Sequence, residues 1–210
     1  MFDALLVSMR VTLLAAPAIA LVGLAGAVIL AHWRSPWRNL LELACILPIV
    51  LPPTVTGYYL LNILGRQALG QFVQLLFTPV GAAIAATVMG LPLMIIAGKA
   101  AIAGVDARLE AAARTLGATE WRVLCDVTLP LAKRGLIAGF LLACARAFGE
   151  FGATLMVAGS QPGSTRTLAI ALYDAVQLGE ETTAMAIVAL LTGCTVLVLA
   201  LTRWLEGSAR

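Results

Sequence analysis

The stretch AAARTLGATEWRVLCDVTLP, residues 111–130, is the one long polar passage in a chain that is otherwise strongly apolar. It combines regularly spaced apolar residues with four charged side chains, Arg114, Glu120, Arg122 and Asp126. Hydrocarbon excludes these charges, and a simple loop has no need of the spaced apolar residues. The passage is therefore expected to fold outside the lipid and to contact another surface.

The composition places the chain among integral membrane proteins. Of its 210 residues, 61% are hydrophobic and 12% are charged, and the mean hydropathy is +0.97. Soluble domains contain about 45–50% apolar and about 25% charged residues, so a soluble fold would lack the polar residues to cover its surface. No basic run interleaved with aromatic residues is present, and binding to nucleic acid is not expected.

Five apolar runs are long enough to cross a membrane as helices, which takes about 20 residues each. They predict an all-α, multi-pass fold in the cell membrane with spans at about residues 11–31, 40–64, 80–97, 136–158 and 184–201. Ten Lys and Arg residues fall in segments 32–39 and 98–135 and after the last run, whereas three fall on the other side. Because cytoplasmic loops are enriched in Lys and Arg, the N-terminus is predicted outside and the C-terminus in the cytoplasm.

Prolines and small residues give two packing signals inside the spans. Pro48 and the pair Pro52 and Pro53 interrupt the second span, because proline lacks the backbone donor and bends or breaks a helix. Such breaks are tolerated at membrane depth where the backbone is buried in protein or lines a wet cavity. Small residues at four-residue spacing, which allow close helix packing in lipid, are Ala82, Ala86, Gly90, Gly135 and Gly139.

Catalytic and metal-binding motifs are missing from the sequence. It has no GxxxxGK[ST] phosphate loop, no HExxH, no GxSxG and no arrangement of paired carboxylates, so another chain would have to supply energy for uphill transport. The four cysteines form no CxxC pair and are interpreted as small core residues, and no metal site is expected.

The polar passage predicts two short helices. Residues 106–116 form the first, and Gly117 ends it because glycine tolerates left-handed backbone angles. Thr119 can cap the second helix, and Pro130 would end it. One face of the second helix would carry Trp121, Leu124 and Cys125. A large aromatic residue on an exposed helix favours a protein groove as its destination, and the alternative is a helix lying on the lipid interface.

The passage resembles the EAA loop of ABC importer permeases, whose pattern is EAA, three residues, Gly, nine residues, Ile, one residue and Leu-Pro. The positions in register are Gly117, Val127, Leu129 and Pro130, with Val in place of Ile. The motif glutamate departs from this pattern, because Ala111 holds its position and Glu110 stands one residue earlier. In this family the loop forms the coupling helix that sits in a cleft of the ATPase subunit. The resemblance implies that residues 105–130 transmit movement between the ATPase and the membrane.

The resemblance extends over nearly the whole chain. The stretches LPIVLPPTVTGYYLL (47–61), GVDARLEAAARTLGA (104–118) and ARAFGEFGATLMVAG (145–159) are similar to the permease subunit of molybdate ABC importers, with sulfate and thiosulfate importers as close relatives. This implies a single ABC transmembrane type I domain over residues 1–210 that carries molybdate, and tungstate with it. It also implies a homodimer, two ATPase copies that bind ATP and Mg, and a periplasmic or lipid-anchored oxyanion-binding protein. The chain itself would be non-catalytic and free of cofactors.

Two sets of functional residues follow from these arguments. The residues expected to couple to the ATPase are Ala111, Gly117, Ala118, Thr119, Trp121, Arg122, Leu124, Leu129 and Pro130. Those expected along the translocation pathway are Pro52, Pro53, Arg146, Gly149, Glu150 and Gly152.

Arg146 and Glu150 lie four residues apart in the fourth span, and ionisable groups at membrane depth usually face a cavity or a partner. Arg146 could attract an oxyanion, or the two could form a structural pair that neutralises itself. A membrane enzyme or a stand-alone anion channel that uses this pair is the alternative of a different class.

Overall fold

The computed structural model describes residues 1–33, 35–65 and 74–207, so Arg34, Arg66 and Arg210 of the charge count lie outside the described residues. In this part of the chain four helical runs are long and apolar enough to cross a membrane. These are α1 (Phe2–His32), α4 (Pro79–Ala103), the run Glu120–Phe148 that contains α7 (Leu129–Phe148), and α10 (Glu181–Gly207). A bent pair of helices, counted as one broken span, brings the number to the five that were predicted.

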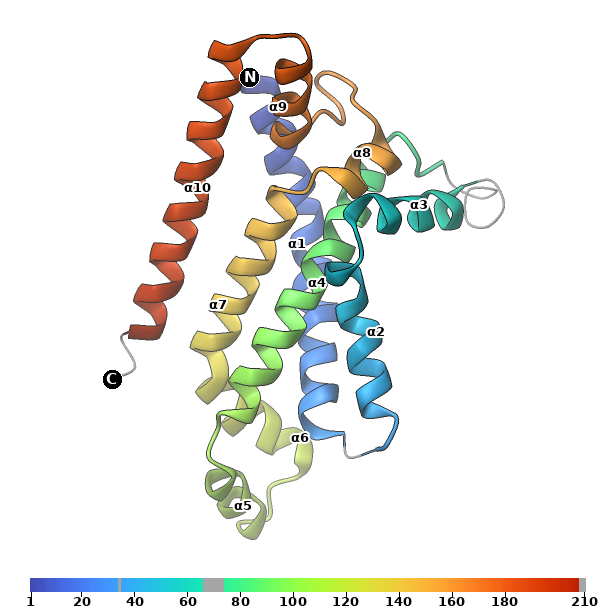
Figure 1. Cartoon of the computed structure of the whole chain (residues 1–210). Helices are drawn as coiled ribbons and strands as arrows, with labels where there is room; N and C mark the ends of the chain where they lie inside the picture. The colour runs from blue at the N-terminus through green and yellow to red at the C-terminus, as the bar shows by residue number, and fades with distance from the viewer. Residues whose placement is uncertain (34, 66–73, 208–210) are drawn as a thin grey trace.

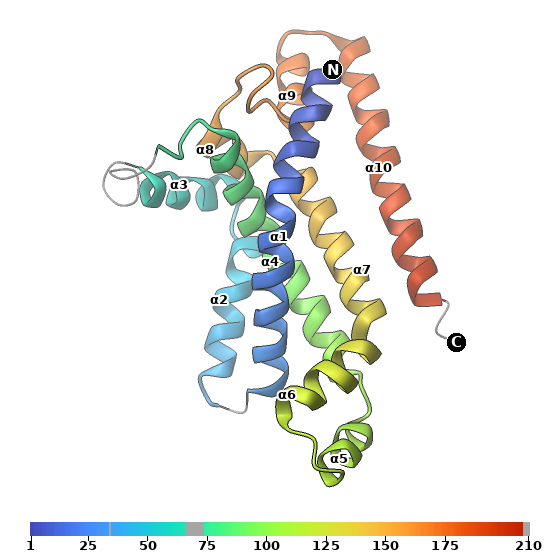
Figure 2. The same cartoon turned by 180° about the vertical axis from the view of Figure 1, so that it is seen from behind.

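Helix α4 is the centre of the bundle and packs between α1 and α7 (Figures 1 and 2). Ala82 and Ala86 are fully buried in the main core cluster, together with Ile19 of α1 and Ala143 of α7. A Cβ atom added at Gly139 of α7 would lie 2.7 Å from the Cβ of Ala97 in α4, so only glycine permits this approach. The close packing predicted from small residues is confirmed.

The second predicted span is broken. Helices α2 (Arg38–Val50) and α3 (Pro53–Leu64) meet at an angle of 108°, and α3 projects from the side of the bundle (Figure 1). Leu51 is extended, with ψ of 146°, because a residue that precedes proline is disfavoured in the helical region. The predicted break at Pro52 is confirmed and divides the span at residues 40–64 into two helices, whereas Pro48 lies inside α2 without ending it.

The fourth predicted span also differs from the structure. A continuous helix over residues 136–158 is wrong, because α7 ends at Phe148 and α8 (Gly152–Ala158) begins after a three-residue interruption. Pro130 does not end the preceding helix, since α6 (Glu120–Arg122), the π-helical turn η2 (Val123–Thr128) and α7 follow one another without a gap. Pro130 stands in the first turn of α7, where proline is tolerated because the N–H that it lacks would have no partner within that helix. The π-helical turn η2 joins the preceding helix to this turn.

The two ends of the bundle carry different segments. The N-terminus and α9 (Leu168–Gln177) lie at one end. At the other end lie α5 (Ala107–Thr115), α6 and the connection between α1 and α2, and α10 runs toward it (Figures 1 and 2). The segments rich in Lys and Arg therefore share one end, the arrangement that the predicted orientation requires.

Candidate functional site

The polar passage folds as a helical hairpin beyond the end of the bundle. Asp106 caps α5 by accepting a hydrogen bond of 2.9 Å from the backbone N–H of Arg108. Gly117 has φ of +85°, and its N–H donates to the carbonyl of Arg114 while that of Ala118 donates to Ala113. These two bonds form a Schellman motif. Thr119 caps α6, so the predicted helix, turn and cap are all confirmed.

An ion pair links the end of α5 to the start of α6. Arg114 donates to both carboxylate oxygens of Glu120, from Nε at 2.7 Å and from Nη2 at 3.1 Å. This hydrogen bond lowers the pKa of Glu120 below its usual value and raises the pKa of Arg114. Arg114 stands in the last turn of α5 and Glu120 in the first turn of α6, where each charge also suits the helix dipole. The hairpin is therefore held by its two caps and one bidentate contact.

Glu110 joins the hairpin to the bundle. Its Oε1 accepts a hydrogen bond of 2.7 Å from the hydroxyl of Thr128, which is fully buried at the end of η2. Its Oε2 lies 3.5 Å from Arg114 Nη2, and Oε1 lies 4.0 Å from Nε2 of His32 at the end of α1. The Glu110 side chain is 15% exposed. By contrast, Ala111, which holds the motif position, lies on the exposed side of α5.

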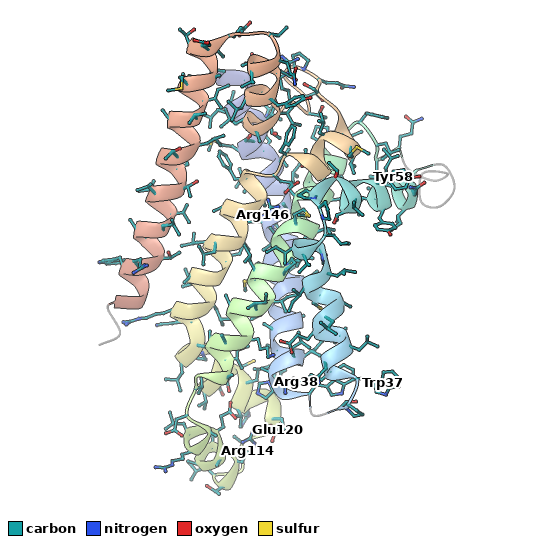
Figure 3. All side chains as sticks on the ribbon, in the orientation of Figure 1. Trp37, Arg38, Tyr58, Arg114, Glu120 and Arg146 are labelled. Carbon is teal, nitrogen blue, oxygen red and sulfur yellow. The ribbon has the colours of Figure 1, made fainter. Side chains whose placement is uncertain are left out.

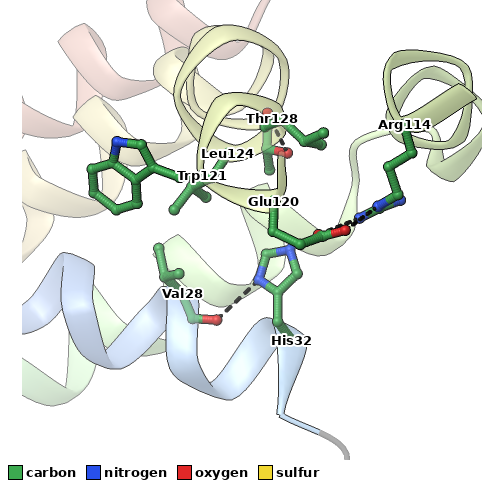
Figure 4. Close-up of a pocket in the computed structure, with 8 residues that line it drawn as sticks. Val28, His32, Arg114, Glu120, Trp121, Leu124 and Thr128 are labelled. Carbon is green, nitrogen blue, oxygen red and sulfur yellow. Dashed lines mark hydrogen bonds and ion pairs between the residues drawn. The ribbon is translucent and has the colours of Figure 1, made fainter. Parts of the chain in front are cut away.

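A cavity of about 350 Å³ separates the hairpin from the end of α1. Its lining comes from α1, α5, α6 and η2: Val28, His32, Arg114, Glu120, Trp121, Val123, Leu124 and Thr128. Figure 4 shows His32 reaching from α1 toward Glu120, with the Arg114–Glu120 pair closing one side. The hairpin thus rests on α1 through a partly open, largely apolar space and through Glu110.

The predicted apolar face of the second helix is only partly correct. Trp121 and Leu124 line the same cavity, but Trp121 is 71% exposed and Val123, rather than Cys125, is buried. The reason is the π-helical turn, which has more residues per turn than the α-helical period used in the prediction. Trp121 and the 89% exposed Leu116 leave apolar side chains on the surface of the hairpin.

The other predicted coupling residues surround this surface. Arg122 and Pro130 are exposed, and Ala118 and Leu129 are half-buried. The structure therefore brings the predicted coupling residues together in one protruding unit with the start of α7.

The two helix breaks of the membrane region meet. A Cβ atom added at Gly152, the first residue of α8, would lie 3.0 Å from Pro53, the first residue of α3. A Cβ atom added at Gly57 would lie 2.8 Å from the backbone of Ala153, so the two short helices pack backbone to backbone. Pro52 and Gly149, in the two interruptions, are exposed.

Arg146 and Glu150 form an ion pair beside the break between α7 and α8. Arg146 lies near the end of α7 (Figure 3), and its Nη1 is 2.6 Å from Oε2 of Glu150. The Glu150 side chain is 1% exposed, and its Oε1 accepts a hydrogen bond of 3.0 Å from the N–H of Ala153. The Arg146 side chain is 28% exposed. Glu150 follows the end of α7 and contacts Arg146 from the interruption rather than from a shared helix face.

Sequence reasoning missed several polar residues at these sites. His32, Glu110 and Thr128 form contacts that only the folded chain brings together, although the spacing of Glu110 and Arg114 is that of an i, i+4 ion pair. The hydroxyls of Thr56 in α3 and Thr154 in α8 are buried, and the described structure gives them no hydrogen-bond partner. Each of the two helices that meet at the break therefore carries one buried hydroxyl that is available for a hydrogen bond.

Comparison with known proteins identifies relatives of this chain. The model of the family described as "Binding-protein-dependent transport system inner membrane component" matches residues 23–210. The molybdenum transport system permease protein ModB of Escherichia coli is 39% identical over 217 residues, covering 100% of this chain and 95% of the relative. The putative molybdenum transport system permease protein YvgM of Bacillus subtilis is 42% identical over 156 residues, covering 71% and 69%.

Solved structures share the fold. A structure of the MetNI methionine ABC transporter in inward-facing conformations has a TM-score of 0.82 and 17% identity, covering 100% of this chain and 96% of the other. An amino acid ABC transporter with histidines has a TM-score of 0.69 and 19% identity, covering 99% and 92%. The predicted ABC importer transmembrane fold is confirmed.

Proposed function

The chain belongs to the family of binding-protein-dependent transport system inner membrane components, and we propose that it is the permease subunit of an ATP-driven importer that moves molybdate into the cytoplasm. It is a multi-pass protein of the inner membrane. The observation that carries the proposal is the 39% identity to a molybdenum permease along the full length of this chain. Tungstate, an anion of the same shape and charge, would follow the same route.

The geometry at the helix breaks suits an oxyanion. The N-termini of α3 and α8 meet at the Pro53–Gly152 contact, and helix N-termini carry partial positive charge. Broken helices of this kind present such ends to anionic cargo in many transporters. Arg146 would contribute a positive charge that Glu150 balances, while Glu150 would also hold the guanidinium in place and cap α8. Pro52, Pro53, Arg146, Gly149, Glu150 and Gly152 would line or shape the pathway.

We also propose that the α5–α6 hairpin binds a separate ATPase subunit, which would bind ATP and Mg. The exposed apolar side chains Leu116 and Trp121 lie beyond the end of the bundle, where they could enter a protein groove. The hairpin is internally rigid through its caps and the Arg114–Glu120 pair, so it could transmit movement to α7. Two copies of this chain, two ATPases and an oxyanion-binding protein at the α9 end would complete the importer.

Uptake in sealed vesicles tests this function. The chain would be reconstituted with its ATPase and binding protein, and uptake of labelled molybdate, tungstate and sulfate would be measured in parallel with and without ATP. We expect ATP-dependent molybdate uptake that excess tungstate competes and that excess sulfate leaves unchanged. ATP-dependent sulfate uptake that molybdate fails to compete would assign the chain to a sulfate importer. Molybdate flux that needs no ATPase would indicate a channel.

A further inference from the structure

His32 is the single histidine of the sequence, and it is the last residue of α1. Its Nδ1 lies 3.0 Å from the carbonyl oxygen of Val28 in the preceding turn. A carbonyl oxygen only accepts hydrogen bonds, so Nδ1 carries a proton and donates. This contact fixes both the orientation of the imidazole and its neutral tautomer.

The second ring nitrogen faces a carboxylate. With the proton of the neutral ring on Nδ1, Nε2 holds a lone pair, and it lies 4.0 Å from Oε1 of Glu110. Two acceptors cannot form a hydrogen bond with each other. Only when the ring gains a second proton does Nε2 become a donor and the ring carry a positive charge, and the contact then becomes an ion pair. Histidine is the side chain whose charge normally changes between about pH 5 and pH 8.

The surroundings of His32 combine charged groups with access to water. His32 lines two cavities, of about 350 Å³ and about 480 Å³, and the charged groups that line them with it are the carboxylates of Glu110 and Glu120 and the guanidinium of Arg114. The remaining lining from α1, α4, α5, α6 and η2 is apolar or, at Thr128, a hydroxyl. The His32 side chain is 43% exposed, so the imidazole can exchange protons with water.

We propose that His32 is a proton-sensitive positioning residue for the α5–α6 hairpin. The protonated ring ties the end of α1 to Glu110, and Glu110 is already bonded to Thr128 at the base of α7. Protonation therefore connects α1, the hairpin and α7 through one carboxylate, and deprotonation breaks the link between His32 and Glu110. The functional consequence rests on the proposed role of the hairpin in coupling. When His32 is protonated, the hairpin cannot follow the ATPase without moving α1 as well. We therefore expect more molybdate to be carried per ATP at lower cytoplasmic pH.

Nuclear magnetic resonance tests the geometry independently of transport. The assembled complex would contain this chain labelled with ¹⁵N-histidine and free of affinity tags, so that its single imidazole gives the only signal. We expect the neutral ring to carry its proton on Nδ1, and the protonated ring to show an Nε2–H proton that exchanges more slowly with water than in Glu110→Gln. A neutral ring protonated on Nε2, or the same exchange rate in both proteins, would overturn the proposal.

A pH profile tests the consequence. The ratio of molybdate transported to ATP hydrolysed would be measured with the vesicle interior at about pH 6 and about pH 8, where histidine changes charge. We expect the wild-type ratio to be about three-fold higher at the lower pH, a modest change because a partly exposed ion pair contributes little free energy. The ratio of His32→Gln should not change with pH. Asp126→Asn removes an exposed carboxylate outside both cavities and should keep the wild-type profile.

The outcomes separate the inference from the proposed function. A wild-type ratio that does not change with pH, or a His32→Gln profile equal to the wild type, would overturn the inference while leaving molybdate transport in place. Absence of ATP-dependent molybdate uptake at every pH would overturn the proposed function instead, and the tautomer and exchange measurements would still decide the geometry of His32.

Discussion

The hydroxyl of Thr128 donates a hydrogen bond of 2.7 Å to Oε1 of Glu110, 18 residues earlier in the chain. This contact anchors α5, which has no buried residue of its own, to the π-helical turn that leads into α7. Any force on the hairpin therefore reaches α7 through the backbone of α6 and also through this side-chain contact.

Thr128→Val should destabilise the protein and reduce coupling. Loss of the hydroxyl leaves the Glu110 carboxylate without its closest donor in a site that is 15% exposed, which should cost about 1–3 kcal/mol. The midpoint of thermal unfolding and molybdate uptake per ATP measure the two effects. Thr115→Val is the matched control, because the Thr115 hydroxyl is exposed and bonds only Ala112 of its own helix. Equal behaviour of the two variants would contradict the anchoring role.

Gly117→Val should impair transport through backbone strain alone. Gly117 has φ of +85° and nothing within 4 Å of an added Cβ atom, so the expected cost of about 1–3 kcal/mol is conformational. Gly179 provides the control, with φ of +74° and equally open surroundings at the opposite end of the bundle. Gly179→Val should lose similar stability but retain ATPase binding. If both variants bind the ATPase and transport normally, the turn at Gly117 is not needed for coupling.

Leu124→Asp should weaken binding to the ATPase without preventing membrane insertion. Leu124 is half-buried beside Trp121 in the cavity under the hairpin, and a carboxylate there would replace an apolar contact and repel Glu120. Co-purification with the ATPase and uptake in vesicles report the effect, with Asp126→Asn as an exposed control on the same turn. Wild-type association of Leu124→Asp would remove this face from the proposed interface.

Arg146 and Glu150 can be tested as a pair. Breaking a buried pair by removing one partner costs about 3–5 kcal/mol, whereas replacing both can be nearly neutral. Glu150→Gln keeps an oxygen that can accept from the N–H of Ala153, so α8 retains its cap. We expect Arg146→Met combined with Glu150→Gln to restore the amount of folded protein lost in the single variants but not molybdate uptake. Restored uptake would make the pair purely structural.

The orientation of the chain is open to a direct test. The Lys- and Arg-rich segments lie at the end of the bundle that carries α5 and α6, and α10 runs toward that end. A reporter enzyme that works only in the cytoplasm, fused after Arg210, should be active. A periplasmic reporter at the same position should be silent, and activity there would reverse the topology and place the hairpin on the wrong side of the membrane for an ATPase.

The sequence alone determined features that depend on a few neighbouring residues. Apolar runs imply helices that cross the membrane, because lipid leaves backbone groups no other partner. The turn at Gly117, the cap at Thr119 and the break before Pro53 follow from backbone angles that the local residues permit or forbid. The likeness of the polar passage to a coupling loop also rested on short-range spacing.

Only the tertiary structure decided which residues meet. The Thr128–Glu110 bond, the contact of Gly152 with Pro53 and the position of His32 beside Glu110 join segments far apart in the chain. Helices that are apolar on all sides have no polar face that would mark their packing side, and in lipid the hydrophobic effect does not select one. Close fit between small residues selects the packing side instead. That fit depends on the shapes of two helices together, and the sequence of either helix alone does not specify it.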